Sequence, residues 1–150
     1  MDSFTPERRR LSSRAAASNR SLERPKALVV DSDDANRAFA SEALRSFAPG
    51  FDVATARDPQ QALAWIDTFP PDLLVTDLRF DSDGAGALRE RLRGNARTGD
   101  CRVVVLSSLP SDDVRVESAR LTSDAILFKP VGLPNLLETV RRVMSRSRSH

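Results

Sequence analysis

Four polar residues of the kinds that handle phosphoryl groups follow short apolar runs in this 150-residue sequence. They are two aspartates, a serine and a lysine, at Asp31, Asp77, Ser107 and Lys129. Two like charges about 4 Å apart repel by about 4 kcal/mol at an effective dielectric of 20, so neighbouring buried carboxylates require a cation. Lys129 can supply one positive charge. A divalent ion such as Mg²⁺ can supply the rest, because it is usually held by one or two carboxylates and phosphate oxygens.

The chemistry that this set of side chains supports is phosphoryl transfer. An aspartate beside a metal ion and a lysine is a competent nucleophile towards phosphorus and would become an aspartyl phosphate. The metal ion and the ammonium group would neutralise the charge on the phosphoryl oxygens during the transfer. A serine hydroxyl nearby can hydrogen-bond the bound group. All of this requires a fold that brings the four residues together.

Apolar periodicity and helix-capping signals divide the chain into alternating strands and helices. Strands are predicted over residues 27–30, 51–56, 73–77, 102–107 and 125–129. Helices are predicted over residues 35–48, 59–69 and 84–93, for about ten residues after Ser111, and from Pro134 onward. The predicted N-caps are Asp34, Asp58 and Ser111.

This alternation predicts an α/β fold: a three-layer, doubly wound, five-stranded parallel sheet with helices on both faces. Short connections of this kind form right-handed crossovers. In such sheets ligands bind outside the carboxyl ends of the strands. The four polar residues end the first, third, fourth and fifth predicted strands, so we expect them to meet at that edge.

Four segments resemble the signature segments of response-regulator receiver domains, the CheY-like superfamily. They are VVD at 29–31, PDLLVTD at 71–77, VVVLSS at 103–108 and FKP at 128–130. Their order and spacing also match that family within about a residue. The resemblance covers roughly residues 26–145 and implies a flavodoxin-like strand order 2-1-3-4-5.

The resemblance also implies a role for each residue of the set. Asp77 would be the phosphoacceptor, Lys129 the phosphate-binding lysine and Ser107 the switch hydroxyl, although Ser108 is the alternative inward-facing serine. Asp31, Asp77 and the backbone carbonyl of Arg79 would hold Mg²⁺. The peptide bond between Lys129 and Pro130 would be cis.

A protein with these features would be a single-domain response regulator of a two-component phosphorelay. A histidine kinase or phosphotransfer protein would deliver the phosphoryl group, and a downstream target protein would read the result by contact. The domain would assist its own phosphorylation without turning over an external substrate. Because no output domain follows residue 145, we expect a stand-alone receiver.

Several positions depart from the family pattern. Ser32 stands where the family usually has a second acid, so Mg²⁺ binding should be weak unless Asp33 approaches. The segment after Asp77 lacks the usual proline and is predicted as a loop, in which the Arg79 side chain could place a cation near the phosphoryl group. Ile126 replaces the usual aromatic residue, and Phe128 is expected on the opposite face of its strand.

These departures motivate two competing functions. The first is a degenerate pseudo-receiver that binds partners without being phosphorylated. The second is a haloacid-dehalogenase-like phosphatase, in which Asp31 would be the nucleophile and Asp33 the acid or base. The phosphatase is the weaker hypothesis, because it leaves Asp77 without a role and lacks a later acidic motif.

The positive charge of the sequence is concentrated at its ends. Residues 1–25 hold six arginines and three acids, residues 141–150 hold four arginines and no acid, and residues 26–140 have a net charge of −5. No aromatic residue is interleaved with these arginines, so nucleic-acid binding is not favoured. We expect disordered basic tails over 1–24 and 146–150 around a receiver domain over 25–145.

The remaining composition indicates a cytoplasmic protein. No run of about 18 apolar residues is present, and no apolar segment follows the N-terminal arginines, so neither a membrane span nor a secretory signal is predicted. Cys101 is the only cysteine, which excludes an internal disulfide. The only histidine is His150, whose terminal position excludes histidine-based triads and metal sites.

Overall fold

A five-stranded parallel sheet forms the centre of the computed structural model, which describes residues 24–47, 50–83 and 85–146. The strands are β1 (Lys26–Val30), β2 (Asp52–Ala56), β3 (Leu73–Asp77), β4 (Arg102–Ser107) and β5 (Ala125–Phe128). Their order is β2-β1-β3-β4-β5. The predicted fold class and strand order are therefore confirmed.

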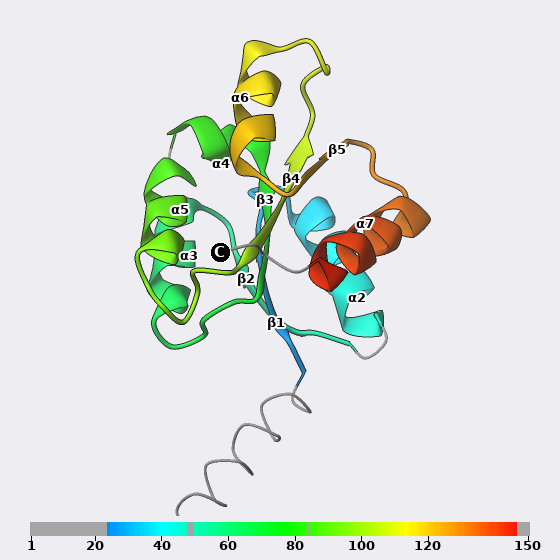
Figure 1. The fold of residues 1–150 in the computed structure, drawn as a ribbon. Coiled ribbons are helices and arrows are strands. Elements are labelled where there is room, and N and C mark those ends of the chain that lie inside the picture. The colour runs from blue at the N-terminus through cyan, green and yellow to red at the C-terminus, as the bar shows by residue number, and fades with distance from the viewer. Residues whose placement is uncertain (1–23, 48–49, 84, 147–150) are drawn as a thin grey trace, which may run out of the picture.

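Helices cover both faces of this sheet and complete the three layers (Figure 1). One face is covered by α2 (Asp34–Ser46) and α7 (Leu133–Ser145). The other is covered by α3 (Pro59–Ile66), α4 (Leu78–Asp83), α5 (Ala85–Arg93) and α6 (Val114–Thr122). Within the described ranges, no helix is both long and apolar enough to cross a membrane.

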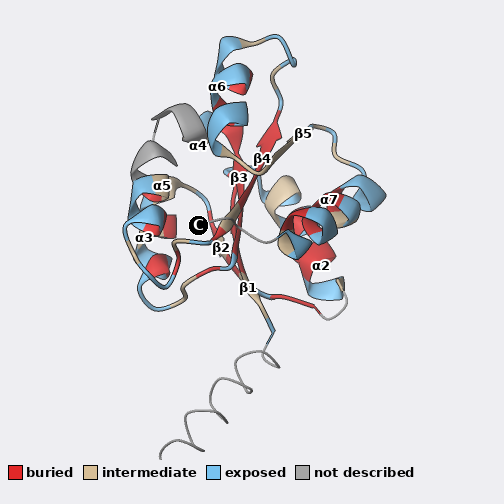
Figure 2. Ribbon diagram, in the orientation of Figure 1, coloured by how far each residue is buried: buried red, intermediate tan, exposed pale blue. Residues whose placement is uncertain are grey.

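Two hydrophobic clusters fill the spaces between the layers. Along β1, Leu28 and Val30 pack against α3 and α5, whereas Ala27 and Val29 pack against α2 and α7. This alternation follows from the two-residue period of a strand. Figure 2 shows the result: the central strands are buried, and helices α2, α3, α6 and α7 each bury the side that faces them. Both faces of the sheet are thus closed, and its carboxyl edge remains as the place for a site.

The strand register aligns the residues that end neighbouring strands. Val30 is paired with Thr76, and Asp77 with Leu106. Ser107 is paired with Phe128. Asp31 and Asp77 directly follow the first of these pairs, and Ser107 and Lys129 follow Leu106 and Phe128. The four polar residues therefore lie at the same edge of the sheet, as predicted.

Two predicted N-caps are wrong by one or two residues, whereas Asp58 is confirmed. Asp33, not Asp34, caps α2: its backbone is extended and its side chain accepts from the amide of Asn36. In the same way Asp113, not Ser111, caps α6. Each cap lies in a run of acidic or hydroxyl residues, and the residue with extended backbone geometry takes the position.

The segment predicted as a loop after Asp77 is instead the short helix α4. Leu78, its first residue, is buried in the hydrophobic cluster on that face of the sheet. The Arg79 amide donates a hydrogen bond of 2.7 Å to Asp77 Oδ1, as an amide of the first turn does to a capping residue. A buried apolar contact and a capping carboxylate therefore allow a helix where the polar composition indicated a loop.

Candidate functional site

Lys129 joins the two strand-end aspartates at the carboxyl edge of the sheet. Its Nζ donates hydrogen bonds of 3.0 Å to Asp31 Oδ2 and 2.5 Å to Asp77 Oδ2. Both carboxylates are 2% exposed, and the lysine side chain is 14% exposed. Buried charges of this kind require a partner, and one amine here serves two carboxylates.

The charge on the Lys129 amine is stabilised by this arrangement. Burial favours the neutral amine and would lower its pKa. The hydrogen bonds to Asp77 and Asp31 outweigh burial, so the pKa is raised above the ordinary lysine value of 10.5. The site therefore holds a protonated amine at neutral pH.

Arg79 brings a second cation to Asp77. Its guanidinium Nη2 lies 3.7 Å from Asp77 Oδ2, while its backbone amide donates to Asp77 Oδ1. The side chain is 59% exposed, so solvent weakens the ion pair. The guanidinium nevertheless lies beside Asp77, the residue that the sequence analysis predicts to be the phosphoacceptor.

Asp31 is held by its own loop as well as by Lys129. Its Oδ1 accepts from the Asp33 amide at 2.9 Å, and its backbone carbonyl accepts from Arg37 Nη1 at 2.9 Å. The sequence analysis did not identify Arg37 as part of the site. Its spacing of three residues from Asp34, with which it also pairs, was the one signal available.

Of the two serines that end β4, Ser107 is buried and Ser108 is exposed. The Ser107 hydroxyl accepts from the Leu109 amide at 2.9 Å and donates to the Leu109 carbonyl at 3.0 Å. In this arrangement the hydroxyl is engaged with its own turn. A role in binding a phosphoryl group would require the hydroxyl to leave these two bonds.

The oxygen donors at this edge do not form a ready magnesium site. Ser32 is exposed, and the Asp33 carboxylate, which might have replaced the missing acid, caps α2. Asp31 and Asp77 each use both side-chain oxygens in hydrogen bonds. In the part of the chain that the structure describes, no group of three or more histidine, cysteine or acidic side chains could hold a metal. The donor set therefore does not fit a tightly held resident ion.

The Arg79 carbonyl, the other expected ligand, belongs to the first turn of α4. Helical carbonyls point towards the C-terminal end of their helix. Asp77 precedes α4, at the opposite end. We therefore expect this carbonyl to become available to a cation only if the first turn of α4 opens.

Strand β5 settles two smaller expectations. Ile126 packs in the cluster with α3, α5 and α6, while Leu127 packs with α2 and α7. Phe128 lies two residues after Ile126, and side chains two residues apart in a strand point to the same face of the sheet. The expectation that Phe128 faces the side opposite to Ile126 is therefore wrong. The Lys129–Pro130 peptide bond is cis, as expected.

Comparison with known proteins agrees with this geometry. The family model of the response regulator receiver domain matches residues 27–141. The chain belongs to this family. The match includes residues of all five strands and the four polar residues at the carboxyl edge. The chain is therefore a receiver domain of two-component signal transduction.

Two curated relatives and two solved structures illustrate the similarity. The chain is 34% identical over 122 residues to the transcriptional regulatory protein PrrA of Mycobacterium tuberculosis. It is 28% identical over 123 residues to the DNA-binding dual master transcriptional regulator RpaA of Synechocystis. These alignments cover 81% and 82% of this chain but only 51% and 50% of the relatives. The chain thus spans about half the length of the curated relatives it matches.

The solved structures match over nearly their full length. A response regulator from Thermotoga maritima superposes with a TM-score of 0.68 at 27% identity, covering 83% of this chain and all of that one. A response regulator receiver protein from Pseudomonas putida gives a TM-score of 0.64 at 28% identity, covering 80% and 98%. This chain therefore has the fold of these receiver structures.

Proposed function

We propose that Asp77 of this receiver domain accepts a phosphoryl group from a histidine kinase or a phosphotransfer protein. The observation that carries the proposal is the buried contact of 2.5 Å between the Lys129 amine and Asp77 at the ligand-binding edge of the sheet. A carboxylate held beside a fixed cation is prepared for attack on phosphorus, because the cation also meets the incoming phosphoryl oxygens.

The transfer would conserve charge without an external base. A side-chain oxygen of Asp77 would form a bond to phosphorus while the bond between phosphorus and its donor breaks. The donor keeps that electron pair; from a small donor such as acetyl phosphate it leaves as acetate. The product is an aspartyl phosphate, one per chain, so we propose no turnover of an external substrate.

Phosphorylation would change the balance of interactions at the sheet edge. The added group brings negative charge and three acceptor oxygens. We propose that Lys129 pairs with one of these oxygens and that Ser107 exchanges its bonds to Leu109 for a bond to another. The turn that contains Ser107 lies between β4 and α6, so this exchange of hydrogen bonds would shift the start of α6.

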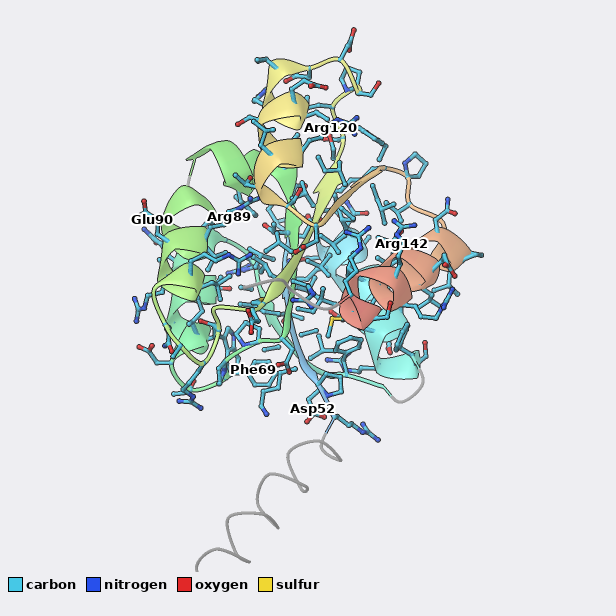
Figure 3. The ribbon with its side chains drawn as sticks, in the orientation of Figure 1. Asp52, Phe69, Arg89, Glu90, Arg120 and Arg142 are labelled. Carbon is cyan, nitrogen blue, oxygen red and sulfur yellow. The ribbon has the colours of Figure 1, made fainter. Side chains whose placement is uncertain are left out.

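We propose that the surface formed by α6, β5 and α7 responds to this change and is recognised by a partner. Val114 and Leu121 of α6, Phe128 and Leu133 are large apolar side chains that remain exposed there. Figure 3 shows Arg120 on α6 and Arg142 on α7, the two helices that flank β5. A downstream target protein would contact this surface. By family likeness we also propose a cytoplasmic location, with neither membrane nor nucleic acid as a direct partner of this domain.

A pseudo-receiver that binds partners without phosphorylation is the second candidate. Ser32 favours it, and so does the engagement of both Asp77 oxygens by Lys129 and Arg79. A phosphatase of the haloacid-dehalogenase kind receives no such support, because the Asp33 carboxylate that would act as acid or base caps α2.

Labelling with acetyl phosphate separates the two candidates. Intact-protein mass spectrometry should show one added phosphoryl group on the wild type and none on Asp77→Asn. Asp67→Asn, which alters an exposed aspartate at the C-terminal end of α3, is the matched control and should label like the wild type. Absence of labelling from the wild type, with and without Mg²⁺, would favour the pseudo-receiver.

A further inference from the structure

The guanidinium of Arg79 occupies a defined place beside the phosphoacceptor. Three interactions locate it: its backbone amide is bonded to Asp77 Oδ1, its Nη2 lies 3.7 Å from Asp77 Oδ2, and its Cζ lies 5.9 Å from the centre of the Phe80 ring. Phe80 is itself packed against the hydrophobic cluster under α4. The start of α4 thus sets where this side chain can reach.

Among the described residues, the four side chains linked through the Asp31 and Asp77 carboxylates have a net charge of zero. Asp31 and Asp77 contribute two negative charges, and Lys129 and Arg79 contribute two positive ones, all linked by contacts of 3.7 Å or less. A third carboxylate at the position of Ser32 would leave a net negative charge for a divalent ion to neutralise. The observed donor set does not leave one.

We propose that Arg79 supplies the second positive charge for phosphorylation of Asp77, so that the reaction does not depend on a divalent metal ion. This inference rests on the proposed function and assigns Arg79 a catalytic role within it. A guanidinium suits the role because it is permanently charged and its planar set of donors matches two phosphoryl oxygens at once.

The charges of the reaction support this assignment. Acetyl phosphate brings a phosphoryl group with about two negative charges, and acetate leaves with one, while Asp77 loses its own charge on forming the new bond. The aspartyl phosphate then carries two negative charges beside Lys129 and Arg79; counted with Asp31, these groups have a net charge of −1, and without Arg79 it would be −2. Asp31 remains paired with Lys129.

The test measures labelling by acetyl phosphate in EDTA and in Mg²⁺. The wild type should label at rates within about twofold of each other in the two conditions. In EDTA, Arg79→Ala should label about tenfold more slowly than the wild type, and Arg79→Lys should recover part of that loss. Removing one charge-stabilising donor from a buried site slows a reaction by about 100-fold or more. Because the Arg79 side chain is 59% exposed, solvent reduces its contribution to about tenfold. Arg91→Ala, which breaks an exposed pair with Asp67 on another helix, is the control and should label as the wild type does.

Ser32→Asp with Arg79→Ala completes the set. The double variant restores the family's acid and removes the extra cation, so its labelling should require Mg²⁺. Labelling of the wild type only in Mg²⁺ would overturn the role of Arg79 and leave the proposed function intact, as would wild-type rates for Arg79→Ala in EDTA. No labelling of the wild type in either condition would overturn the proposed function and this inference together.

Discussion

Replacing Lys129 by methionine should destabilise the domain strongly, since the change removes the one amine that two buried carboxylates share. Methionine retains much of the length of the side chain, so the packing is largely kept. Asp31 and Asp77, each 2% exposed, would face one another without Lys129. Removing one partner of a buried ion pair costs about 3–5 kcal/mol. Because Arg79 still lies 3.7 Å from Asp77, we expect the lower end of that range, about 3 kcal/mol.

Urea unfolding followed by circular dichroism measures this loss. With a slope typical of a domain of this size, about 3 kcal/mol lowers the midpoint by roughly 2 M. Lys26→Met, at the only other lysine in the chain, is the matched control and should change stability by less than about 0.5 kcal/mol. Adding Asp31→Asn to Lys129→Met should recover part of the loss, because one of the two unpaired charges is removed.

A loss below about 1 kcal/mol for Lys129→Met would refute this reasoning. So would an Asp31→Asn change that gives no recovery in the Lys129→Met background. Either result would mean that the three side chains do not share the buried interaction from which the magnitude was derived.

Three further predictions concern Lys129 and the loop that follows Asp31. The pKa of Lys129 in the folded state is raised above 10.5, so its contribution to stability should be present below about pH 10.5 and lost as the pH rises through the higher folded value. Urea midpoints measured from pH 8 to 12 should therefore fall at the alkaline end for the wild type and less for Lys129→Met. Asp33→Ala should cost about 1 kcal/mol in the same assay, whereas Asp34→Ala should cost less than about 0.5 kcal/mol, since only Asp33 caps α2; equal losses would contradict the capping assignment. Ser32→Asp should bind Mg²⁺ more tightly than the wild type in calorimetric titrations, and unchanged binding would show that position 32 does not face the metal.

Because the sequence contains no tyrosine, the alkaline measurement is specific for the Lys129 amine. The sequence contains no tyrosine and only two lysines, and arginine remains charged to about pH 12, so few side chains other than Lys129 change charge between about pH 10 and pH 12. A fall in wild-type stability that Lys129→Met does not share can therefore be assigned to this amine.

Much of the sheet could be predicted from sequence because its strands carry strong local signals. The segments LLVTD and RVVVLS are apolar on both sides, as strands buried between two helical layers must be. Their order, once the receiver resemblance was identified, placed Asp77 and Lys129 at the same edge, and the contact between them follows from the register.

The helix boundaries were harder to predict, for physical reasons. The run from Ser32 to Asp34 offers three residues that can cap a helix, and only backbone geometry selects Asp33. Helix α4 was missed because its polar sequence is typical of a loop. Its formation depends on tertiary contacts, the burial of Leu78 and the capping of the Arg79 amide by Asp77.

The finer chemistry of the site could be predicted only in part. The sequence indicated that Ser32 removes a metal ligand and that Arg79 lies nearby. It did not indicate that Asp33 is committed to α2, or that Arg37 reaches back six residues to the Asp31 carbonyl. Such contacts depend on the path of one loop, which has no periodicity from which to infer it.

The most direct test of the account is to locate the phosphoryl group after labelling. An aspartyl phosphate is reduced by borohydride to homoserine, which marks its position in a peptide map. We predict that homoserine appears at residue 77 in the acetyl phosphate-treated wild type, and nowhere else in the receiver domain. Homoserine at residue 31 or 33, or labelling of Asp77→Asn equal to that of the wild type, would contradict the assignment of Asp77 as the phosphoacceptor.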